Sequence, residues 1–315
     1  MPNFMITNTC NLNCSYCFGR DQMRPLRKKE FMTRATFLNL LKWLDGSKNN
    51  YFHLMGGEPT LHPDFLWMLE TARKRSFTVD IFSNGITKFT PDEMKAAKDT
   101  SHDWVINVND PSKYNKTMRG RLEDFLSVLG KQAVLTFNVI NVDYDPAFLL
   151  DYIDKYKLKR SVKIGIALPT VQRTNLYASH EEFGGLSASM LRLAGIFKKH
   201  DIRGEFECGV PSCFFSDKDK VTLDKCGFDY SSGCRSILDI LPNGEVIYCL
   251  PLAKIHKVKY NKYGDYGGLK QHFEEFYLPY RGVGYKKECL SCKCKSNCYG
   301  SCLSRIIPNF SQIPA

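Results

Sequence analysis

Short apolar runs alternate with amphipathic segments over the first two-thirds of the chain. The runs are rich in Val, Ile and Phe and end in Gly, Asn, Asp or Pro, which is typical of β-strands. They cover Asn3–Thr7, Tyr51–Met55, Thr78–Ser83, Asp103–Asn109, Ala133–Asn141 and Ser161–Ala167. Helical periodicity between them predicts helices near Arg34–Leu44, Pro63–Lys74, Pro91–Ala97, Arg121–Leu129 and Pro146–Tyr156. Thr33 and Thr90 are the expected N-caps of the first and third of these helices.

Six strands that alternate with helices predict a parallel sheet with right-handed crossovers. Without a seventh and eighth unit, we expect an α/β fold in the form of a partial (β/α)6 TIM-like barrel. Its functional site should lie at the C-terminal ends of the strands. After a further helix near Ser187–Lys199 the periodicity fades and cysteines become dense. We therefore expect a barrel domain over residues 1–199 and a small Cys-rich domain over residues 200–315.

Thirteen cysteines in 315 residues exceed ordinary usage. The chain has no apolar run of about 18 residues, which predicts no transmembrane helix, and its polar N-terminus does not resemble a signal peptide. An odd number of cysteines without an export signal favours metal ligation in a reducing, cytoplasmic compartment over a disulfide framework.

Three cysteines follow the first predicted strand with the spacing Cys10-x3-Cys14-x2-Cys17. Three thiolates on one loop suit three irons of a 4Fe–4S cluster and leave the fourth iron open to a small molecule, whereas electron carriers usually supply a fourth Cys. The alternatives are a three-ligand zinc loop or reduced cysteines without a role, although zinc sites usually pair their ligands.

A second motif, Gly56-Gly57-Glu58-Pro59, ends the second predicted strand. Two glycines let the backbone approach a ligand closely because no Cβ intrudes. The glycine carbonyls and the Glu58 carboxylate are suited to accept hydrogen bonds from an ammonium group, and Pro59 fixes the exit of the chain.

The three-Cys loop, with Tyr16 directly before its last Cys, and the Gly-Gly-Glu-Pro motif together resemble the radical S-adenosylmethionine (SAM) superfamily. The resemblance implies a cluster on Cys10, Cys14 and Cys17, reductive cleavage of SAM to methionine and a 5'-deoxyadenosyl radical, and hydrogen abstraction from a substrate. It also implies a flavodoxin- or ferredoxin-type reductant. The SAM contacts that it implies are Tyr16, Gly56, Gly57, Glu58, Pro59, Ser83, Asn84, Asn107, Arg119 and Ile166.

The ten remaining cysteines follow the predicted barrel. Cys234 and Cys249 flank a hairpin signature with Asn243-Gly244 at its turn, and a Cys-x2-Cys-x5-Cys-x3-Cys run begins at Cys289. This region resembles the SPASM extension of radical SAM enzymes, which binds two auxiliary 4Fe–4S clusters. The resemblance assigns Cys226, Cys234, Cys249 and Cys302 to the first cluster and Cys289, Cys292 and Cys298 to the second.

The eighth auxiliary ligand stays open at this point. Cys208, Cys213 or Cys294 could supply it, with the first two preferred; the second cluster could keep an open iron; or only one auxiliary cluster forms. A zinc ribbon or knuckle is the remaining alternative for this region. The formal charge of +11 counts every Cys as neutral, and ligation of three clusters would remove about five charges. We therefore expect no nucleic-acid or membrane partner.

An auxiliary cluster that accepts an electron favours net oxidation of the substrate. The leading hypothesis is modification of a peptide or protein, such as a thioether or carbon–carbon cross-link. The alternatives are oxidation, rearrangement or epimerisation of a small molecule such as an aminosugar or amino acid, and an electron-transfer protein, which would have no use for a SAM site. Because the chain starts directly at the barrel, we expect a separate protein or the barrel rim to hold any leader peptide.

One departure from the family pattern bears on the substrate. Sulfatase-maturing relatives carry a basic carboxylate directly after the Cys that corresponds to Cys249, whereas this chain has Leu250. Oxidation of a Ser or Cys side chain to an aldehyde needs a proton acceptor. That chemistry would require Glu205, Glu207, Asp239 or a Tyr to replace the missing carboxylate.

Overall fold

One mixed sheet organises the chain in the computed structural model, which describes residues 1–23, 29–234, 237–281, 283–294, 298 and 300–307. The strand order is β11-β10-β9-β1-β2-β3-β4-β5-β6-β7-β8, and β1 to β8 are parallel to one another in chain order. The strand bounds are β1 Asn3–Thr7, β2 Tyr51–Gly56, β3 Thr78–Ser83, β4 Trp104–Val108, β5 Ala133–Val139, β6 Ser161–Ile166, β7 Arg203–Phe206, β8 Phe228–Asp229, β9 Asp239–Ile240, β10 Glu245–Ile247 and β11 Val258–Lys259.

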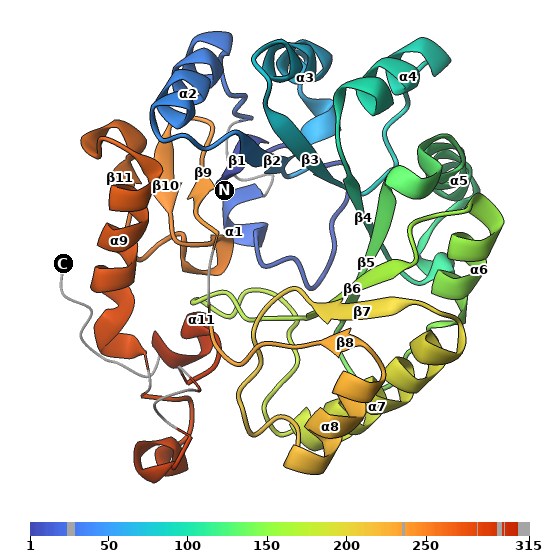
Figure 1. The fold of residues 1–315 in the computed structure, drawn as a ribbon, viewed down its shortest axis with the longest axis vertical. Helices are drawn as coiled ribbons and strands as arrows, with labels where there is room; N and C mark the ends of the chain where they lie inside the picture. Colours follow the sequence, from blue (N-terminus) through green and yellow to red (C-terminus); the bar gives the residue numbers. More distant parts are fainter. Residues whose placement is uncertain (24–28, 235–236, 282, 295–297, 299, 308–315) are drawn as a thin grey trace.

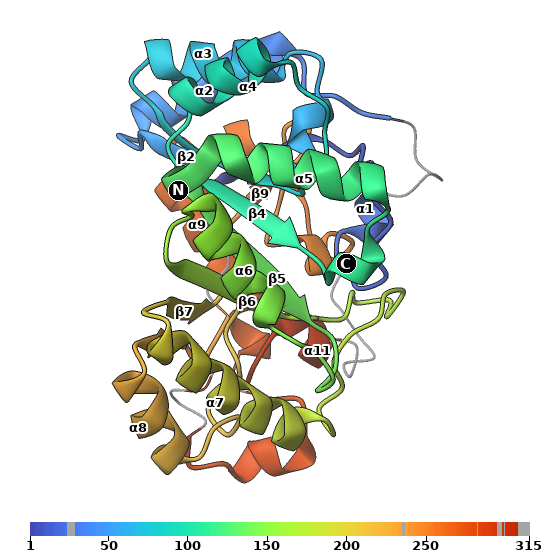
Figure 2. The same cartoon turned by 90° about the vertical axis from the view of Figure 1, so that its right-hand side faces the viewer.

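The helices that connect the parallel strands follow one another around the outer side of the arc of strands (Figure 1), and Figure 2 shows the same arrangement from the side. Their bounds are α2 Arg34–Gly46, α3 Phe65–Lys74, α4 Pro91–Thr100, α5 Lys116–Leu129, α6 Ala147–Tyr156, α7 Phe183–Lys199 and α8 Asp217–Lys225. Three further helices, α1 Arg20–Met23, α9 Tyr266–Tyr277 and α11 Leu303–Ile306, belong to the loop after β1 and to the C-terminal region.

The predicted α/β class with a parallel sheet is confirmed, and all six predicted strands form within two residues of their expected ends. The N-caps are also confirmed: the Thr33 hydroxyl accepts the Thr36 N–H, and Thr90 forms a capping box with Glu93. These features follow from local sequence, because apolar periodicity and cap chemistry act over a few residues.

Two short strands extend the parallel sheet beyond the six that were predicted. β7 and β8 continue it after residue 199, and α8 connects them. The division of the chain at residue 199 stays a prediction, while the sheet itself runs through that position.

The sheet stays open, with β8 and β11 as its edge strands. The hairpin predicted around Asn243-Gly244 is confirmed: β9 pairs antiparallel with β10, and Gly244 at the turn has a φ of 76°. β9 also pairs in parallel with β1, at the side of β1 where a closing barrel strand would lie.

A continuous apolar core fills the space between the sheet and its helices. Phe4, Phe37 and Phe52 illustrate it: they come from β1, α2 and β2, are fully buried and contact one another by their rings. The core fixes the strands whose C-terminal ends form the site. Within the described residues, no helix is both long and apolar enough to span a bilayer.

Candidate functional site

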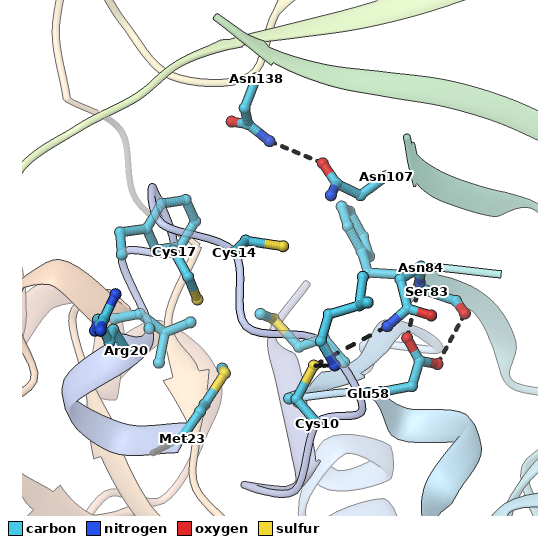
Figure 3. Close-up of a pocket in the computed structure, with 18 of the residues that line it drawn as sticks. Cys10, Cys14, Cys17, Arg20, Met23, Glu58, Ser83, Asn84, Asn107 and Asn138 are labelled. Atoms are coloured by element: carbon cyan, nitrogen blue, oxygen red, sulfur yellow. Dashed lines mark hydrogen bonds between the residues drawn. The ribbon is translucent and has the colours of Figure 1, made fainter. Parts of the chain in front are cut away.

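A cavity of about 200 Å³ opens at the C-terminal ends of the parallel strands. Figure 3 shows that side chains from the loop after β1 and from several strand ends face it. Its lining includes Cys10, Cys14, Tyr16, Cys17, Arg20, Met23, Met55, Gly56, Gly57, Glu58, Ser83, Asn84, Asn107, Thr136, Asn138, Glu207 and Leu250. The two sequence motifs therefore meet in one place, as strand-end geometry predicts.

The loop after β1 holds its three cysteines around the same space. Its turns are fixed by backbone hydrogen bonds from the Cys17 N–H to the Cys14 carbonyl and from the Arg20 N–H to the Cys17 carbonyl, both 3.2 Å. Burial raises the pKa of the Cys10 thiol to about 12, and it also raises the pKa of Cys14. Metal ligation would therefore have to displace the thiol protons.

The donor set of this loop fits a 4Fe–4S cluster. Three free thiols line one cavity, and no fourth cysteine lines it with them among the described residues. Across the described part of the chain, no three His, Cys, Asp or Glu side chains are close enough together to hold a single metal ion. A four-iron cluster distributes its ligands over separate irons, so it tolerates wider spacing of the sulfur atoms.

The two glycines of the Gly-Gly-Glu-Pro motif let the exit of β2 lie against the exit of β1. A Cβ at Gly56 would stand 2.4 Å from the Thr7 carbonyl oxygen, and a Cβ at Gly57 would stand 2.3 Å from that of Thr9. Hydrogen bonds seal the contact, with the Glu58 N–H donating to the Thr9 carbonyl at 2.7 Å. The absent side chains thus make room for the backbone of the cysteine loop, and both glycines also line the cavity.

Glu58 is buried, with 1% of its surface exposed. Its Oε1 accepts the Thr60 N–H at 3.2 Å, the Thr60 hydroxyl at 2.5 Å and the Ser83 hydroxyl at 2.8 Å, while among the described residues its Oε2 accepts one bond, from the Asn84 N–H at 2.7 Å. Burial raises the pKa of the carboxyl, and these hydrogen bonds act in the opposite direction. Oε2 keeps capacity for a further donor from the cavity. Pro59 starts the short 3-10 helix Pro59–Leu61 that carries the chain away.

A chain of hydrogen bonds crosses the strand ends on the far wall of the cavity. The Asn138 amide donates to Asn107 Oδ1 at 2.8 Å, Asn107 donates to the Tyr16 hydroxyl at 3.0 Å, and Tyr16 donates to Asn109 Oδ1 at 2.6 Å. The side-chain amide of Asn84 donates to Asn11 Oδ1 at 2.7 Å. These bonds tie the cysteine loop to β4 and β5.

Two of the SAM contacts implied by the resemblance lie elsewhere in the structure. Arg119, on α5, is exposed, and its guanidinium donates to the Pro111 carbonyl at 3.0 Å. Ile166 ends β6 and lines a separate small cavity together with Cys208 and Ser301. Seven of the other implied contacts line the main cavity: Tyr16, Gly56, Gly57, Glu58, Ser83, Asn84 and Asn107. Pro59 directly follows Glu58 in the chain.

The C-terminal cysteines form two groups. The inner cysteine group consists of Cys208, Cys234, Cys249 and Cys302. Removal from bulk water is the main cause of the raised pKa of Cys234 and Cys249, and the neighbouring thiols of the group raise it further. The same two causes raise the pKa of Cys208, although its side chain is exposed at a small cavity. The outer cysteine group consists of Cys213, Cys289, Cys292, Cys294 and Cys298, which line a second cavity of about 440 Å³. In that group the Ser212 N–H donates to Cys298 Sγ at 3.2 Å.

Cys226 lies apart from both groups in the described contacts. It caps the C-terminus of α8, where its N–H bonds the Thr222 and Leu223 carbonyls, and it packs against the apolar core. Cys208 and Cys213, by contrast, both lie on the segment between β7 and α8 and join one group each. The assignment of Cys226 to a cluster stays a prediction, and the described contacts favour Cys208 in its place.

Of the candidates for a replacement base, Glu207 lines the main cavity, as Leu250 does. Glu205 instead pairs with Lys163 at 2.6 Å, and Asp239 is buried and accepts a hydrogen bond from Asn3 at 2.7 Å. Glu207 is exposed to the open cavity, yet the protein around it raises the pKa of its carboxyl by removing bulk water, and the nearby Thr136 hydroxyl lowers that pKa.

Sequence reasoning gave no site role to Thr136 and Asn138 and named Glu207 only as one of several candidate bases, although all three line the cavity. Thr136 and Asn138 lie near the end of a predicted strand, so the strand-end rule was the available signal. Glu207 follows β7, which was not predicted.

Residues 4–141 match the family model described as the Radical SAM superfamily. Among curated proteins, GTP 3',8-cyclase of Mannheimia succiniciproducens is 32% identical over 66 residues, 21% of this chain and 20% of that protein. The S-adenosylmethionine-dependent nucleotide dehydratase of a Thermoplasmatales archaeon is 29% identical over 132 residues, 40% of this chain and 45% of that protein. The chain thus spans a fifth to under half of these relatives.

Among solved structures, SuiB of Streptococcus suis bound to the precursor peptide SuiA resembles this chain with a TM-score of 0.67 at 16% identity, over 97% of this chain and 72% of SuiB. SuiB bound to S-adenosylmethionine gives a TM-score of 0.66 with similar coverage. At this identity the likeness establishes a shared fold over nearly the whole chain, the Cys-rich C-terminal region included.

Proposed function

Because residues 4–141 belong to the radical SAM superfamily, a superfamily of enzymes, we propose that the chain generates a 5'-deoxyadenosyl radical and removes a hydrogen atom from a substrate in the cavity at the strand ends. When bound, a reduced 4Fe–4S cluster and SAM supply the radical. The main support for this proposal is that the three-Cys loop, Gly57 and Glu58 line the same cavity.

The residues of the cavity have separate roles in this proposal. Cys10, Cys14 and Cys17 hold the cluster, while the free acceptor capacity of Glu58 Oε2 orients an ammonium group of SAM. The hydrogen bond between Asn107 and Tyr16 ties the cysteine loop to the end of β4. Apolar side chains such as Met23 and Met55 keep water out of the cavity. Arg119 and Ile166 contribute no contact to this cavity.

We propose a peptide or protein as the substrate, modified by an oxidative cross-link, a thioether or a similar change. The fold likeness to SuiB, solved with its precursor peptide, supports this class. A small-molecule substrate is the second candidate, because the matching curated relatives are named for reactions of nucleotides. We expect a flavodoxin- or ferredoxin-type reductant, a cytoplasmic location that suits thirteen free thiols, and a separate leader-binding protein for a peptide substrate.

The two C-terminal cysteine groups are proposed to hold auxiliary 4Fe–4S clusters, which would accept an electron from the substrate radical. In this assignment the inner group supplies four ligands, with Cys208 in place of Cys226. The outer group supplies Cys289, Cys292 and Cys298 with Cys213 as the fourth. Cys213 comes from the β7–α8 segment, so ligation there would join this segment to the C-terminal cysteines.

The test compares Cys14→Ala with Cys226→Ala after anaerobic reconstitution with iron and sulfide. Each protein is mixed with SAM and dithionite, and 5'-deoxyadenosine is measured by mass spectrometry. We expect product at background in Cys14→Ala and at the wild-type level in Cys226→Ala, since only Cys14 lies at the main cavity. Undiminished 5'-deoxyadenosine in Cys14→Ala would contradict the proposal.

A further inference from the structure

Three hydrogen-bond acceptors converge on one part of the main cavity without an assigned partner. Asn138 on β5 lies opposite Gly165 on β6, and Phe206 on β7 lies opposite Ile164, so Glu207 comes next to Gly165. Because Gly165 has no side chain, the side chains on either side lean over it. A Cβ at Gly165 would stand 2.2 Å from Asn138 Oδ1 and 3.3 Å from Glu207 Oε2.

The hydrogen-bond chain on the cavity wall fixes which atom Asn138 presents there. Tyr16 donates its hydroxyl proton to Asn109 and so accepts from Asn107, whose Oδ1 then accepts from the Asn138 amide. Figure 3 shows the last of these bonds. With its amide nitrogen engaged, Asn138 presents the Oδ1 acceptor over Gly165.

Thr136 supplies the third group. It precedes Asn138 by two residues on β5, so both side chains point to the same face of the sheet. Thr136 is buried, with 4% of its surface exposed. Within the described part of the chain, no group lies at hydrogen-bonding distance and angle from its hydroxyl oxygen. A buried hydroxyl in a cavity wall is costly to leave unbonded, and it lies beside Glu207.

The two carboxylates of this cavity lining differ in their freedom. Glu58 accepts four hydrogen bonds from the protein, whereas the Glu207 carboxylate has the Thr136 hydroxyl as its hydrogen-bonding neighbour among the described residues. The nearby Lys163 is committed to Glu205. The subsite thus holds a carboxylate, an amide oxygen and a hydroxyl, with no protein cation paired to Glu207 among the described ion pairs.

We propose that Glu207, Asn138 and Thr136 form a subsite that binds a primary ammonium group of the substrate. An ammonium carries three N–H donors and one positive charge, which matches three converging oxygen atoms and one free carboxylate. This inference rests on the proposed function, because it takes the cavity as the place where the substrate reacts. The ammonium comes from a lysine side chain of a peptide or from an aminosugar.

The experiment measures binding by isothermal titration calorimetry to the anaerobically reconstituted protein with saturating SAM. The probes are Nα-acetyl-lysine methylamide with its uncharged analogue Nα-acetyl-norleucine methylamide, and glucosamine with glucose. The variant is Glu207→Gln, and the matched control is Glu275→Gln, which removes an exposed carboxylate on α9 that does not line the cavity. Cleavage of SAM is measured in the same samples.

We expect one of the two cationic probes to bind, and which one identifies the substrate class. The uncharged analogues should not bind, Glu207→Gln should weaken binding of the cationic probe by about tenfold or more, and Glu275→Gln should leave it unchanged. Equal binding by Glu207→Gln, equal binding of the uncharged analogues, or binding of neither cation would each overturn the subsite. Loss of SAM cleavage in the wild type would instead overturn the proposed function.

Discussion

A methyl group added at Gly57 should disturb the cysteine loop more than it disturbs the rest of the molecule. The Cβ of Gly57→Ala would stand 2.3 Å from the Thr9 carbonyl oxygen, 2.6 Å from its carbonyl carbon and 3.0 Å from Cys10 Cβ. Ordinary contacts of a Cβ begin near 3.4 Å. Two of these atoms are backbone, so the β1 exit must move by about 1 Å, and overpacking of this kind costs about 1–3 kcal/mol.

Gly120→Ala is the matched control. Gly120 lies inside α5, has no atom within 4 Å of the position of an added Cβ, and has no positive φ. Alanine in a helix interior is favoured over glycine by about 0.5–1 kcal/mol. The two alanine variants should therefore differ in free energy of unfolding by about 1.5–4 kcal/mol, with opposite signs relative to the wild type.

The assay has two readouts. Anaerobic urea denaturation of the unreconstituted proteins gives the stability difference, and iron per chain after reconstitution gives the effect on the loop. Gly57→Ala should lose the iron of the loop cluster, because the displaced segment carries Cys10, while Gly120→Ala should keep it. If Gly57→Ala matched the wild type in both urea midpoint and iron content, the close contact between the two strand exits would not constrain the site.

Three further predictions test other parts of the structure. In a variant that lacks the three loop cysteines, Cys213→Ser should lower iron by about four atoms per chain, the content of one cluster, and Cys226→Ser should not; equal losses would refute the proposed ligand sets. Burial lowers the pKa of His53 to about 4, so the folded state excludes a proton that the unfolded state takes up below pH 6.5. Stability should fall by up to about 3 kcal/mol between pH 6.5 and pH 4, and less in His53→Gln, as urea midpoints at several pH values would reveal. Thr90→Ala removes a capping box and should cost about 1 kcal/mol in urea denaturation without changing 5'-deoxyadenosine formation.

Structural features that depend on a few neighbouring residues can be predicted from the sequence, whereas features that depend on the pairing of distant segments cannot. The six strands and the caps at Thr33 and Thr90 rest on a few neighbouring residues and are confirmed. The short strand β7, Arg203–Phe206, has too few residues for a periodic pattern and forms by pairing with β6. Because β7 was not predicted, the positions of Glu207 and Cys208 at a strand end could not be derived from the sequence.

Residue type alone also could not separate structural from cavity-facing polar groups. Thr136 and Asn138 occupy alternate positions of a strand that was correctly predicted, yet their relation to Glu207 depends on the register of three neighbouring strands. Arg119 was named as a SAM contact because of the resemblance. In the structure it lies on α5 at the surface, where its guanidinium donates a hydrogen bond to the Pro111 carbonyl. A role that depends on register or on helix orientation requires the three-dimensional structure.

The exit of β7 connects the two halves of the proposed chemistry. Glu207 and Cys208 follow β7 in a bend. Glu207 lines the main cavity, while its neighbour Cys208 lines the small cavity with Ser301 and lies close to Cys302. A substrate held by Glu207 would therefore lie one residue along the backbone from a member of the inner cysteine group. If that group holds a cluster, β7 positions both the residue that binds the substrate and a ligand of the cluster that accepts its electron. The pairing of β7 with β6 would then determine the distance between the bound substrate and the inner cysteine group.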